Sequence, residues 1–327
     1  MKTYHWATLG CGVIANQLAQ AMQKDGRTLY SVANRTYENA VNFARKYGIS
    51  KVYQNIQELF EDDNVDIIYI STPHNTHIQY IKEALKHGKH VLCEKSITLN
   101  LQELEEAKKL ADQHHVILAE AMTIYHMPLY KKLHEIIQSN ALGELRMIQM
   151  NFGSYKEYDM KNRFFNPSLA GGALLDIGVY ALSFIRSFMS SVPDNVISQV
   201  KFAPSGVDEQ AGILLMNQVG EMATVSLTLH AKQPKRGMVA FDKGYIEIYD
   251  YPRAEKAMIT YTENQCQEII QCGNSDDALR YEVYDMEQTV SGISEEMHLD
   301  YTFDVMAIMT KIRKTWGFAY PEENQQT

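Results

Sequence analysis

The first part of the chain alternates short apolar runs with amphipathic segments. Residues 4–9 form a β-type run, and the segment that follows places Ile14, Leu18 and Met22 at helical spacing. Further strands are predicted at residues 28–33, 65–71, 90–94 and 116–119, with helices at 38–47, before Gly88, and at 100–114. Because parallel strands require a crossover between them, this alternation predicts a mostly parallel, doubly wound sheet over residues 1–122.

The pattern changes after residue 122. Helices are predicted at residues 128–139, after Gly171, and at 299–316, and a strand is predicted at 146–155. Between residues 196 and 271 strand-like runs are separated by short turn signals at Gly206 and at residues 218–220, 235–237 and 243–244. Strands joined by such turns are antiparallel. The fold class is therefore α/β: an N-terminal Rossmann domain, 1–122, followed by an α+β domain, 123–327, built on a large, mostly antiparallel sheet.

Composition excludes several classes of protein. The chain has 327 residues, 45% of them hydrophobic and 22% charged, which is typical of a globular protein with two domains. A formal net charge of −9 without any Lys/Arg block argues against nucleic acid as a partner. The apolar runs are too short for a bilayer, and no signal-peptide pattern opens the chain. Four scattered cysteines without zinc-like spacing predict no metal site and a reducing, cytoplasmic location.

The turn after the first strand has the pattern of a dinucleotide site, Gly-x-Gly-x-x-Ala. Gly10 would make the tight turn, Gly12 would let the backbone approach a pyrophosphate, and Ala15 is small enough for the helix to pack on the strand. The N–H groups of Val13 and Ile14 would face the phosphates from the helix N-terminus. The alternative is an ordinary tight turn.

The end of the second strand predicts the choice of cofactor. It carries Asn34, Arg35 and Thr36 but no carboxylate, which would bond a ribose hydroxyl and repel a 2′-phosphate. Arg35 can pair with a phosphate and stack on adenine. This favours NADP(H), with NAD(H) still possible; alternatively, Arg35 is a solvated loop charge.

Ligands of open α/β sheets lie at the carboxyl ends of the strands. Two later strands deliver polar residues there, and the predicted cofactor contacts are Thr72, Pro73, Asn75, His77, Glu94 and Lys95. For His77 there are two interpretations: a cofactor contact, or a residue at the start of a helix that faces its own backbone.

Two motifs carry a family resemblance: Glu94-Lys95, and the segment 171–180, Gly-Gly-Ala-Leu-Leu-Asp-Ile-Gly-Val-Tyr. With Glu120-Ala121 and the ending 313–317, they make the chain resemble the glucose–fructose oxidoreductase/inositol dehydrogenase/MocA (Gfo/Idh/MocA) family. The branch it looks most like contains the dihydrodiol dehydrogenases. The family usually has Glu-Lys-Pro, whereas this chain has Ser96 in place of the proline.

The resemblance implies that Lys95, Asp176 and Tyr180 are the catalytic residues of a site between the domains. Asp176 and Tyr180 are four residues apart and share a helix face. A lysine beside an oxidised nicotinamide is pushed towards its neutral form, so it can accept the hydroxyl proton. Tyr180 can share that task while Asp176 orients the lysine or the substrate. Arg163 and Tyr125 are candidate substrate contacts. After Glu120-Ala121 the branch usually carries an arginine before the next proline, where this chain has Tyr125-His126-Met127-Pro128.

These inferences predict an NAD(P)-dependent dehydrogenase or reductase that acts on a sugar, polyol, cyclitol or diol. The cofactor supplies the hydride chemistry. The alternatives are a non-catalytic NAD(P)-sensing protein of the same fold, or a reductase of a larger planar substrate. The second domain's sheet is expected to leave one face uncovered and to bury it against a second copy, giving a homodimer or larger oligomer.

Overall fold

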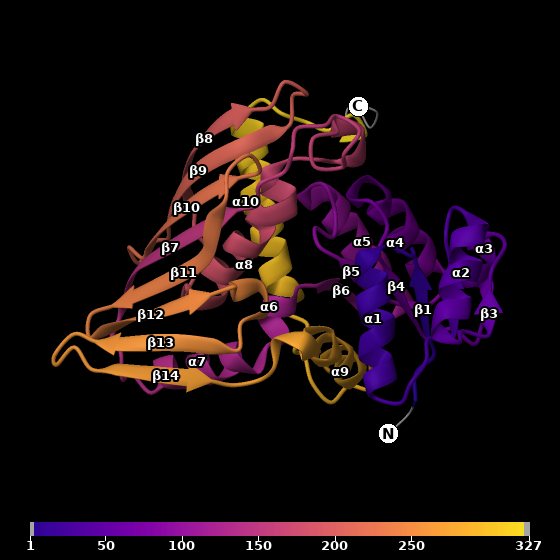
Figure 1. The fold of residues 1–327 in the computed structure, drawn as a ribbon, viewed down its shortest axis with the longest axis horizontal. Coiled ribbons are helices and arrows are strands. Elements are labelled where there is room, and N and C mark those ends of the chain that lie inside the picture. Colours follow the sequence, from indigo (N-terminus) through magenta and orange to yellow (C-terminus); the bar gives the residue numbers. More distant parts are fainter. Residues whose placement is uncertain (1–2, 324–327) are drawn as a thin grey trace. The chain divides into compact units, whose positions relative to one another are not determined.

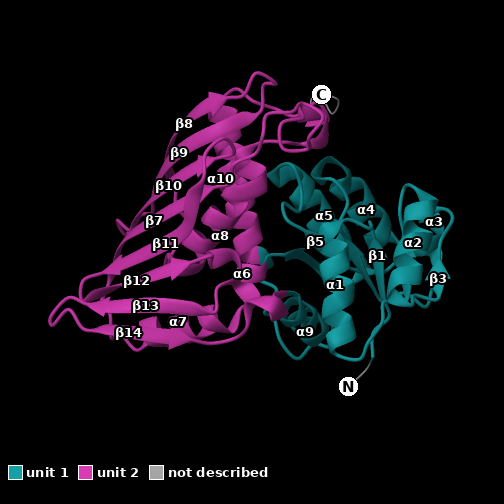
Figure 2. Cartoon of the chain, in the orientation of Figure 1, with its two compact units in different colours: residues 1–122, 279–299 teal, residues 123–278, 300–327 magenta. Residues whose placement is uncertain are grey.

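The computed structural model describes residues 3–323, and the chain divides into two compact units. Unit 1 consists of residues 1–122 and 279–299, and unit 2 of residues 123–278 and 300–327 (Figure 2). A segment from the second half of the sequence thus belongs to the first unit. The chain therefore passes from one unit to the other three times, at 122/123, 278/279 and 299/300.

Unit 1 is built on one parallel sheet of six strands in the order β3-β2-β1-β4-β5-β6. The strands are β1 Trp6–Leu9, β2 Ser31–Ala33, β3 Lys51–Val52, β4 Ile67–Ile70, β5 His90–Glu94 and β6 Leu118–Ala121. The α-helices between them are α1 Val13–Lys24, α2 Tyr37–Tyr47, α3 Ile56–Glu61, α4 His77–Lys86 and α5 Leu101–His114. This order, with its reversal between β1 and β4, confirms the predicted Rossmann arrangement.

Burial explains why the strands of this sheet read as continuous apolar runs. Every residue of β1 and β4 is buried, since helices cover both faces of a parallel sheet. The register pairs Leu9 with Ala33 on one side and with Ile70 on the other. The carboxyl ends of β1, β2 and β4 therefore lie side by side, and the segments that follow them share one edge of the sheet.

Helix α9 (Ala278–Val290) completes unit 1, and the sequence analysis did not predict it. Glu287 of this helix accepts a hydrogen bond of 2.7 Å from Trp6 Nε1 and pairs with Arg27. Arg280 pairs with Asp25 at the end of α1. The hydrogen bond ties the helix to β1, and the two ion pairs tie it to the residues just after α1, more than 250 positions earlier in the chain.

Unit 2 is built on an eight-stranded sheet in the order β14-β13-β12-β11-β7-β10-β9-β8. The strands are β7 Leu145–Gly153, β8 Asn195–Phe202, β9 Asp208–Met216, β10 Met222–Thr228, β11 Gln233–Phe241, β12 Gly244–Tyr249, β13 Lys256–Tyr261 and β14 Gln267–Gln271. All neighbouring pairs are antiparallel except β7 and β10. The expected large, mostly antiparallel sheet is confirmed.

The helices of the described part of unit 2 lie on one face of this sheet (Figure 1). They are α6 Thr123–His126, α7 Pro128–Gln138, α8 Val179–Phe188 and α10 Leu299–Thr315, and a π-helical turn, Leu174–Gly178, leads into α8. The stretch Pro167–Phe188 is long and apolar enough to cross a membrane, contrary to the expectation from the apolar runs. Its most apolar window is 83% buried inside the protein, so this hydrophobicity serves core packing.

One predicted turn is wrong. Residues 235–237 lie inside β11, with a shift of register between Gln233 and Arg236 opposite β7. Gly237 is explained by packing, because a Cβ there would lie 2.6 Å from the Phe184 ring of α8. The Pro and Gly that predicted a turn therefore mark a β-bulge and a close contact with a helix, because both features also favour these residues.

Candidate active site

The glycine turn of unit 1 is fixed by backbone contacts. Gly10 adopts φ +111° and donates to the Ala33 carbonyl over 2.9 Å, while Ser71 N–H donates to the Leu9 carbonyl over 2.9 Å. A Cβ on Gly10 would meet the backbone oxygen of Ser71 at 2.8 Å. Both the conformation and the space at Gly10 thus require glycine.

Gly12 differs from Gly10, because no packing inside the protein requires it. Its φ is −73°, open to any residue, and no described atom lies within 4 Å of the position of an added Cβ. It is the N-cap of α1, whose first turn has no acidic residue and no side-chain cap among the described contacts. Open space beside uncapped N–H groups of Val13 and Ile14 fits a pyrophosphate.

Cys11 lies between these two glycines and is compatible with an anionic ligand. Burial raises the pKa of its thiol to about 12, so the side chain is uncharged at neutral pH. Asn16 supports the turn from inside the helix, donating from Nδ2 to the Gly12 carbonyl over 2.8 Å.

The end of β2 presents the predicted adenosine-side residues. Asn34 donates from its side chain to the Thr36 carbonyl over 3.0 Å, which shapes the loop. Arg35 is exposed and forms no ion pair with any residue between 3 and 323. Its guanidinium is therefore available to a phosphate at this edge.

The loop after β4 is held by the buried His77. His77 is fully buried, with Nε2 2.8 Å from the Thr72 carbonyl and Nδ1 3.0 Å from the Ser96 carbonyl. Burial lowers the pKa of His77 and outweighs the two carbonyls, so the neutral ring donates to one of them at a time. The ring thus faces backbone carbonyls of its own loop and of the loop after β5, and a contact between His77 and the cofactor stays a prediction. His77 joins the two loops that carry Pro73 and Lys95.

The segment that carries Lys95 is positioned by side chains that the sequence did not single out. The carbonyl of Lys95 accepts from His74 Nε2 over 3.0 Å, and the N–H of Ile97 donates to Glu120 over 3.0 Å. Glu94, just before Lys95, accepts from the Tyr69 hydroxyl. The Lys95–Ser96 peptide bond is cis.

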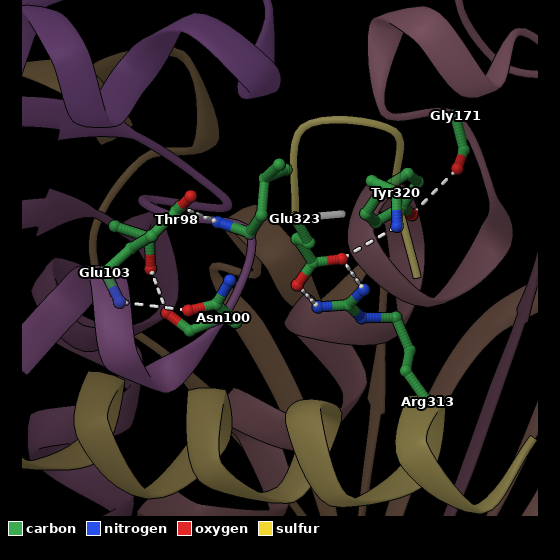
Figure 3. A network of polar contacts seen from close by, with 8 residues as sticks. Thr98, Asn100, Glu103, Gly171, Arg313, Tyr320 and Glu323 are labelled. Atoms are coloured by element: carbon green, nitrogen blue, oxygen red, sulfur yellow. Dashed lines mark hydrogen bonds and ion pairs between the residues drawn. The ribbon is translucent and has the colours of Figure 1, made fainter. Parts of the chain in front are cut away.

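The start of α5 anchors the same segment further on. Asn100 caps the helix by accepting from Glu103 N–H over 2.9 Å, and Glu103 accepts from Leu99 N–H over 2.9 Å (Figure 3). This exchange resembles a capping box, except that Glu103 bonds the N–H of Leu99, one residue before the N-cap. Polar side chains thus hold the backbone on both sides of Lys95. Each has the hydrogen-bonding type that its partner needs: the buried carboxylates accept from N–H groups, and the buried imidazoles donate to carbonyls.

In unit 2 the structure brings together two of the predicted residues. Asp176 lies in the π-helical turn, is 8% exposed, and accepts a hydrogen bond of 3.1 Å from Arg163 Nη2. Arg163 also lies 4.4 Å from the ring centroid of Phe164. A buried carboxylate is costly unless it is paired, and Arg163 supplies this partner. π-Helical turns are frequent at functional sites.

Tyr180 is the second residue of α8, four positions after Asp176, and its ring packs near that of Phe152. Its ring centroid is 6.2 Å from that of Phe152 at the end of β7. Lys235, displaced by the β-bulge in β11, holds its ammonium 5.4 Å from the Phe152 centroid. The sequence analysis missed Lys235 because it assigned these residues to a turn, although Pro within a strand-like run is a signal for a bulge.

Tyr125 lies in the core of unit 2. It is 5% exposed, and its ring makes an edge contact with Tyr301 of α10 at 5.6 Å. Tyr301 in turn lies under the Arg186 guanidinium at 4.5 Å. A role for Tyr125 in substrate binding stays a prediction.

Between residues 3 and 323, no three His, Cys, Asp or Glu side chains are grouped as metal ligands.

The contrast between the two glycines gives a prediction. Gly12→Ala should leave the thermal stability of the protein nearly unchanged, because its Cβ would enter open space, but should weaken NADPH binding at least tenfold. Gly10→Ala should lower stability as well, through its φ and its clash with Ser71. Differential scanning fluorimetry and NADPH fluorescence titration measure the two effects. Equal affinity of Gly12→Ala and wild type would contradict a dinucleotide at this turn.

Comparison with known proteins gives the context of these residues. Residues 4–122 match the model of an oxidoreductase family with an NAD-binding Rossmann fold, and residues 130–247 match the GFO/IDH/MocA C-terminal domain. A trans-1,2-dihydrobenzene-1,2-diol dehydrogenase from Xenopus tropicalis is 30% identical over 247 residues, 74% of each chain. The enzyme of that name from Danio rerio is 25% identical over 98% of this chain and 99% of its own.

Solved structures show the same fold. Levoglucosan dehydrogenase, in complex with NADH and levoglucosan, superposes with a TM-score of 0.87 at 16% identity, covering 97% of this chain and 98% of its own. The 3-ketoreductase KijD10 from Actinomadura kijaniata, with NADP and TDP-benzene, gives 0.86 at 19% identity, covering 96% and 98%. Together with the two family models, these likenesses confirm the resemblance seen in the sequence: the chain belongs to the Gfo/Idh/MocA family and is an NAD(P)-binding oxidoreductase.

Proposed function

We propose that this oxidoreductase transfers a hydride between NADP(H) and a carbinol or carbonyl carbon of a sugar, polyol, cyclitol or diol. The observation that carries the proposal is the buried Asp176, which lies on the helical segment that also carries Tyr180 and is paired with the more exposed Arg163 of the preceding loop. The relatives named for a dihydrodiol, a keto group and levoglucosan support a hydroxyl-bearing or carbonyl substrate.

The proposed chemistry divides the work between the units. Bound NADP(H) supplies or accepts the hydride at the reacting carbon. Lys95 and Tyr180 accept the hydroxyl proton in oxidation and return it to the carbonyl oxygen in reduction. Asp176 orients the lysine or binds a substrate hydroxyl, and Arg163 pairs with its carboxylate.

A preference for NADP(H) over NAD(H) is supported by the end of β2. Arg35 is exposed and Asn34 and Thr36 add hydrogen-bonding groups, while this strand end bears no carboxylate. A 2′-phosphate would gain a charge-assisted contact there, and it would meet no repulsion from an acidic residue.

A homodimer through the sheet of unit 2 is also proposed. One row of cross-strand neighbours runs over the face opposite the helices: Ile197, Leu214, Thr224, Gln149, Met238, Glu247, Met258 and Ile269. Ile197 is 61% and Ile269 58% exposed. Five of the eight positions, Ile197, Leu214, Met238, Met258 and Ile269, are apolar, and such a surface favours burial against an identical face.

The catalytic assignment predicts the effect of two substitutions. Lys95→Met should lower kcat/KM about a thousandfold, because it removes the proton donor, and Tyr180→Phe should lower it by one to two orders of magnitude. NADPH oxidation against a panel of sugars, ketoses and diones measures both, with NADPH affinity as the control for folding. Undiminished turnover of Lys95→Met would remove Lys95 from the mechanism; tight NADPH binding by wild type without any turnover would favour a sensing protein.

The cofactor assignment has its own test. Arg35→Ala should raise the KM for NADPH ten- to a hundredfold and leave the KM for NADH nearly unchanged, because only NADPH carries the 2′-phosphate. Arg45→Ala, at an exposed position on α2, serves as the matched control. A wild-type enzyme that prefers NADH, or an Arg35→Ala variant that loses both cofactors equally, would contradict the assignment.

The proposed dimer predicts a response to charge in the centre of the sheet face. Wild type should sediment as a dimer at micromolar concentration, and Met238→Glu should shift it to monomer without unfolding it. Circular dichroism checks the fold of the variant. A wild-type protein that is monomeric at tens of micromolar would contradict the proposed interface.

A further inference from the structure

We propose that Asp208 is a positioning residue for the reaction, holding the start of the π-helical turn that carries Asp176. The proposal rests on the function proposed above, because it concerns how the helical segment with Asp176 and Tyr180 is placed. The catalytic scheme uses neither this buried carboxylate nor the segment 313–323 that packs around it, and the proposal assigns both a role.

The double-glycine segment has no side chains with which to hold itself. Gly171 comes so close to the preceding loop that a Cβ would lie 2.6 Å from the Arg163 carbonyl oxygen. Gly172 has φ +126°, and a Cβ there would collide with Asp208 Oδ1. The main chain must therefore be fixed by groups from other elements, and glycine is what allows them to approach.

Asp208 is one of these groups. It is the first residue of β9, is fully buried, and accepts from Leu174 N–H over 2.6 Å. Leu174 opens the π-helical turn, two residues before Asp176. An N–H at the start of a helical turn has no partner within the helix, so a carboxylate there both satisfies it and fixes the turn's origin.

The C-terminal segment supplies the second group. Tyr320 is fully buried and donates from its hydroxyl to the Gly171 carbonyl over 2.8 Å (Figure 3). Arg313 bonds both carboxylate oxygens of Glu323, at 2.6 and 2.9 Å, and Glu323 accepts from Tyr320 N–H over 2.7 Å. Tyr320 thereby holds the carbonyl of Gly171, and Asp208 holds the N–H of Leu174, two residues after Gly172.

Because Asp208 changes its charge near neutral pH, its hold on Leu174 N–H can be tested by varying the pH. Burial raises the pKa of its carboxyl to about 7, against the opposing effects of the Leu174 N–H and the Arg313 charge. The other titratable groups that face this cluster are Tyr320, Glu322 and Glu323, while the adjacent Glu209 is paired with Lys201 at 2.8 Å. Above pH 7 the ionised carboxylate binds Leu174 N–H more strongly than the protonated form does.

Activity and stability should respond to this titration in opposite directions. Since the folded-state pKa lies above the unfolded value of about 3.9, the contribution to stability is full below pH 4 and is lost as pH rises through 7. Positioning of the turn instead improves as Asp208 ionises. A purely structural role would make activity follow stability, whereas a positioning role makes kcat rise through pH 7.

The test compares Asp208→Asn with wild type and with Glu209→Gln, a matched buried carboxylate in the same strand. Asp208→Asn should lower kcat ten- to a hundredfold at pH 8, keep the KM for NADPH, and remove the rise of kcat near pH 7. Asp208→Ala, which also loses the acceptor for Leu174 N–H, should be slower still. Glu209→Gln should keep the wild-type profile.

Hydrogen exchange of residues 171–180 by mass spectrometry separates this proposal from the proposed function. Asp208→Asn should speed exchange there at least tenfold at pH 8, whether or not a substrate has been found. A wild-type protein without turnover would contradict the proposed function. Faster exchange in Asp208→Asn would still show that Asp208 holds the turn. Unchanged exchange, or an unchanged kcat profile in a folded and active Asp208→Asn enzyme, would overturn the proposal.

Discussion

Close approach of one main-chain segment to another is the constraint on which both halves of the proposed site depend. At Gly10 the turn after β1 lies against Ser71, and at Gly171 the double-glycine segment lies against the carbonyl of Arg163, with room for no Cβ at either contact. Such contacts bring backbone polar groups together in the protein interior. Each of these groups must then find a hydrogen-bond partner or remain buried without one at considerable cost.

Buried side chains supply those partners in both units, and they do so around the proposed catalytic residues. His74 and His77 serve the carbonyls of residues 95 and 96, and Glu120 serves the N–H of Ile97. In unit 2, Tyr320 serves the carbonyl of Gly171 and Asp208 serves the N–H of Leu174 at the start of the π-helical turn. The reactive side chains are thus carried on backbone that has little freedom, which is the condition for orienting a substrate and a cofactor.

Electrostatics set the second condition. Asp176 is nearly buried and is paired with Arg163, which offsets part of the cost of burying a carboxylate. Lys235 lies over the Phe152 ring next to Tyr180, which adds positive charge on the same side of the sheet as Tyr180. In the glycine turn the opposite requirement holds: Cys11 stays uncharged, so nothing there repels a phosphate.

The sequence by itself determined the Rossmann order, the antiparallel sheet, the glycine turn and the family, because each rests on local periodicity or on a contiguous motif such as Gly10 to Ala15 or Gly171 to Tyr180. Tertiary structure decided what depends on distant segments. The place of α9 in unit 1 follows from Glu287 bonding Trp6, and the turn signal at residues 235–237 proved to be a bulge because Gly237 faces Phe184. The roles of His77, Asp208 and Tyr320 were also beyond the sequence, since which backbone group a buried side chain satisfies is settled only when remote strands and helices pack.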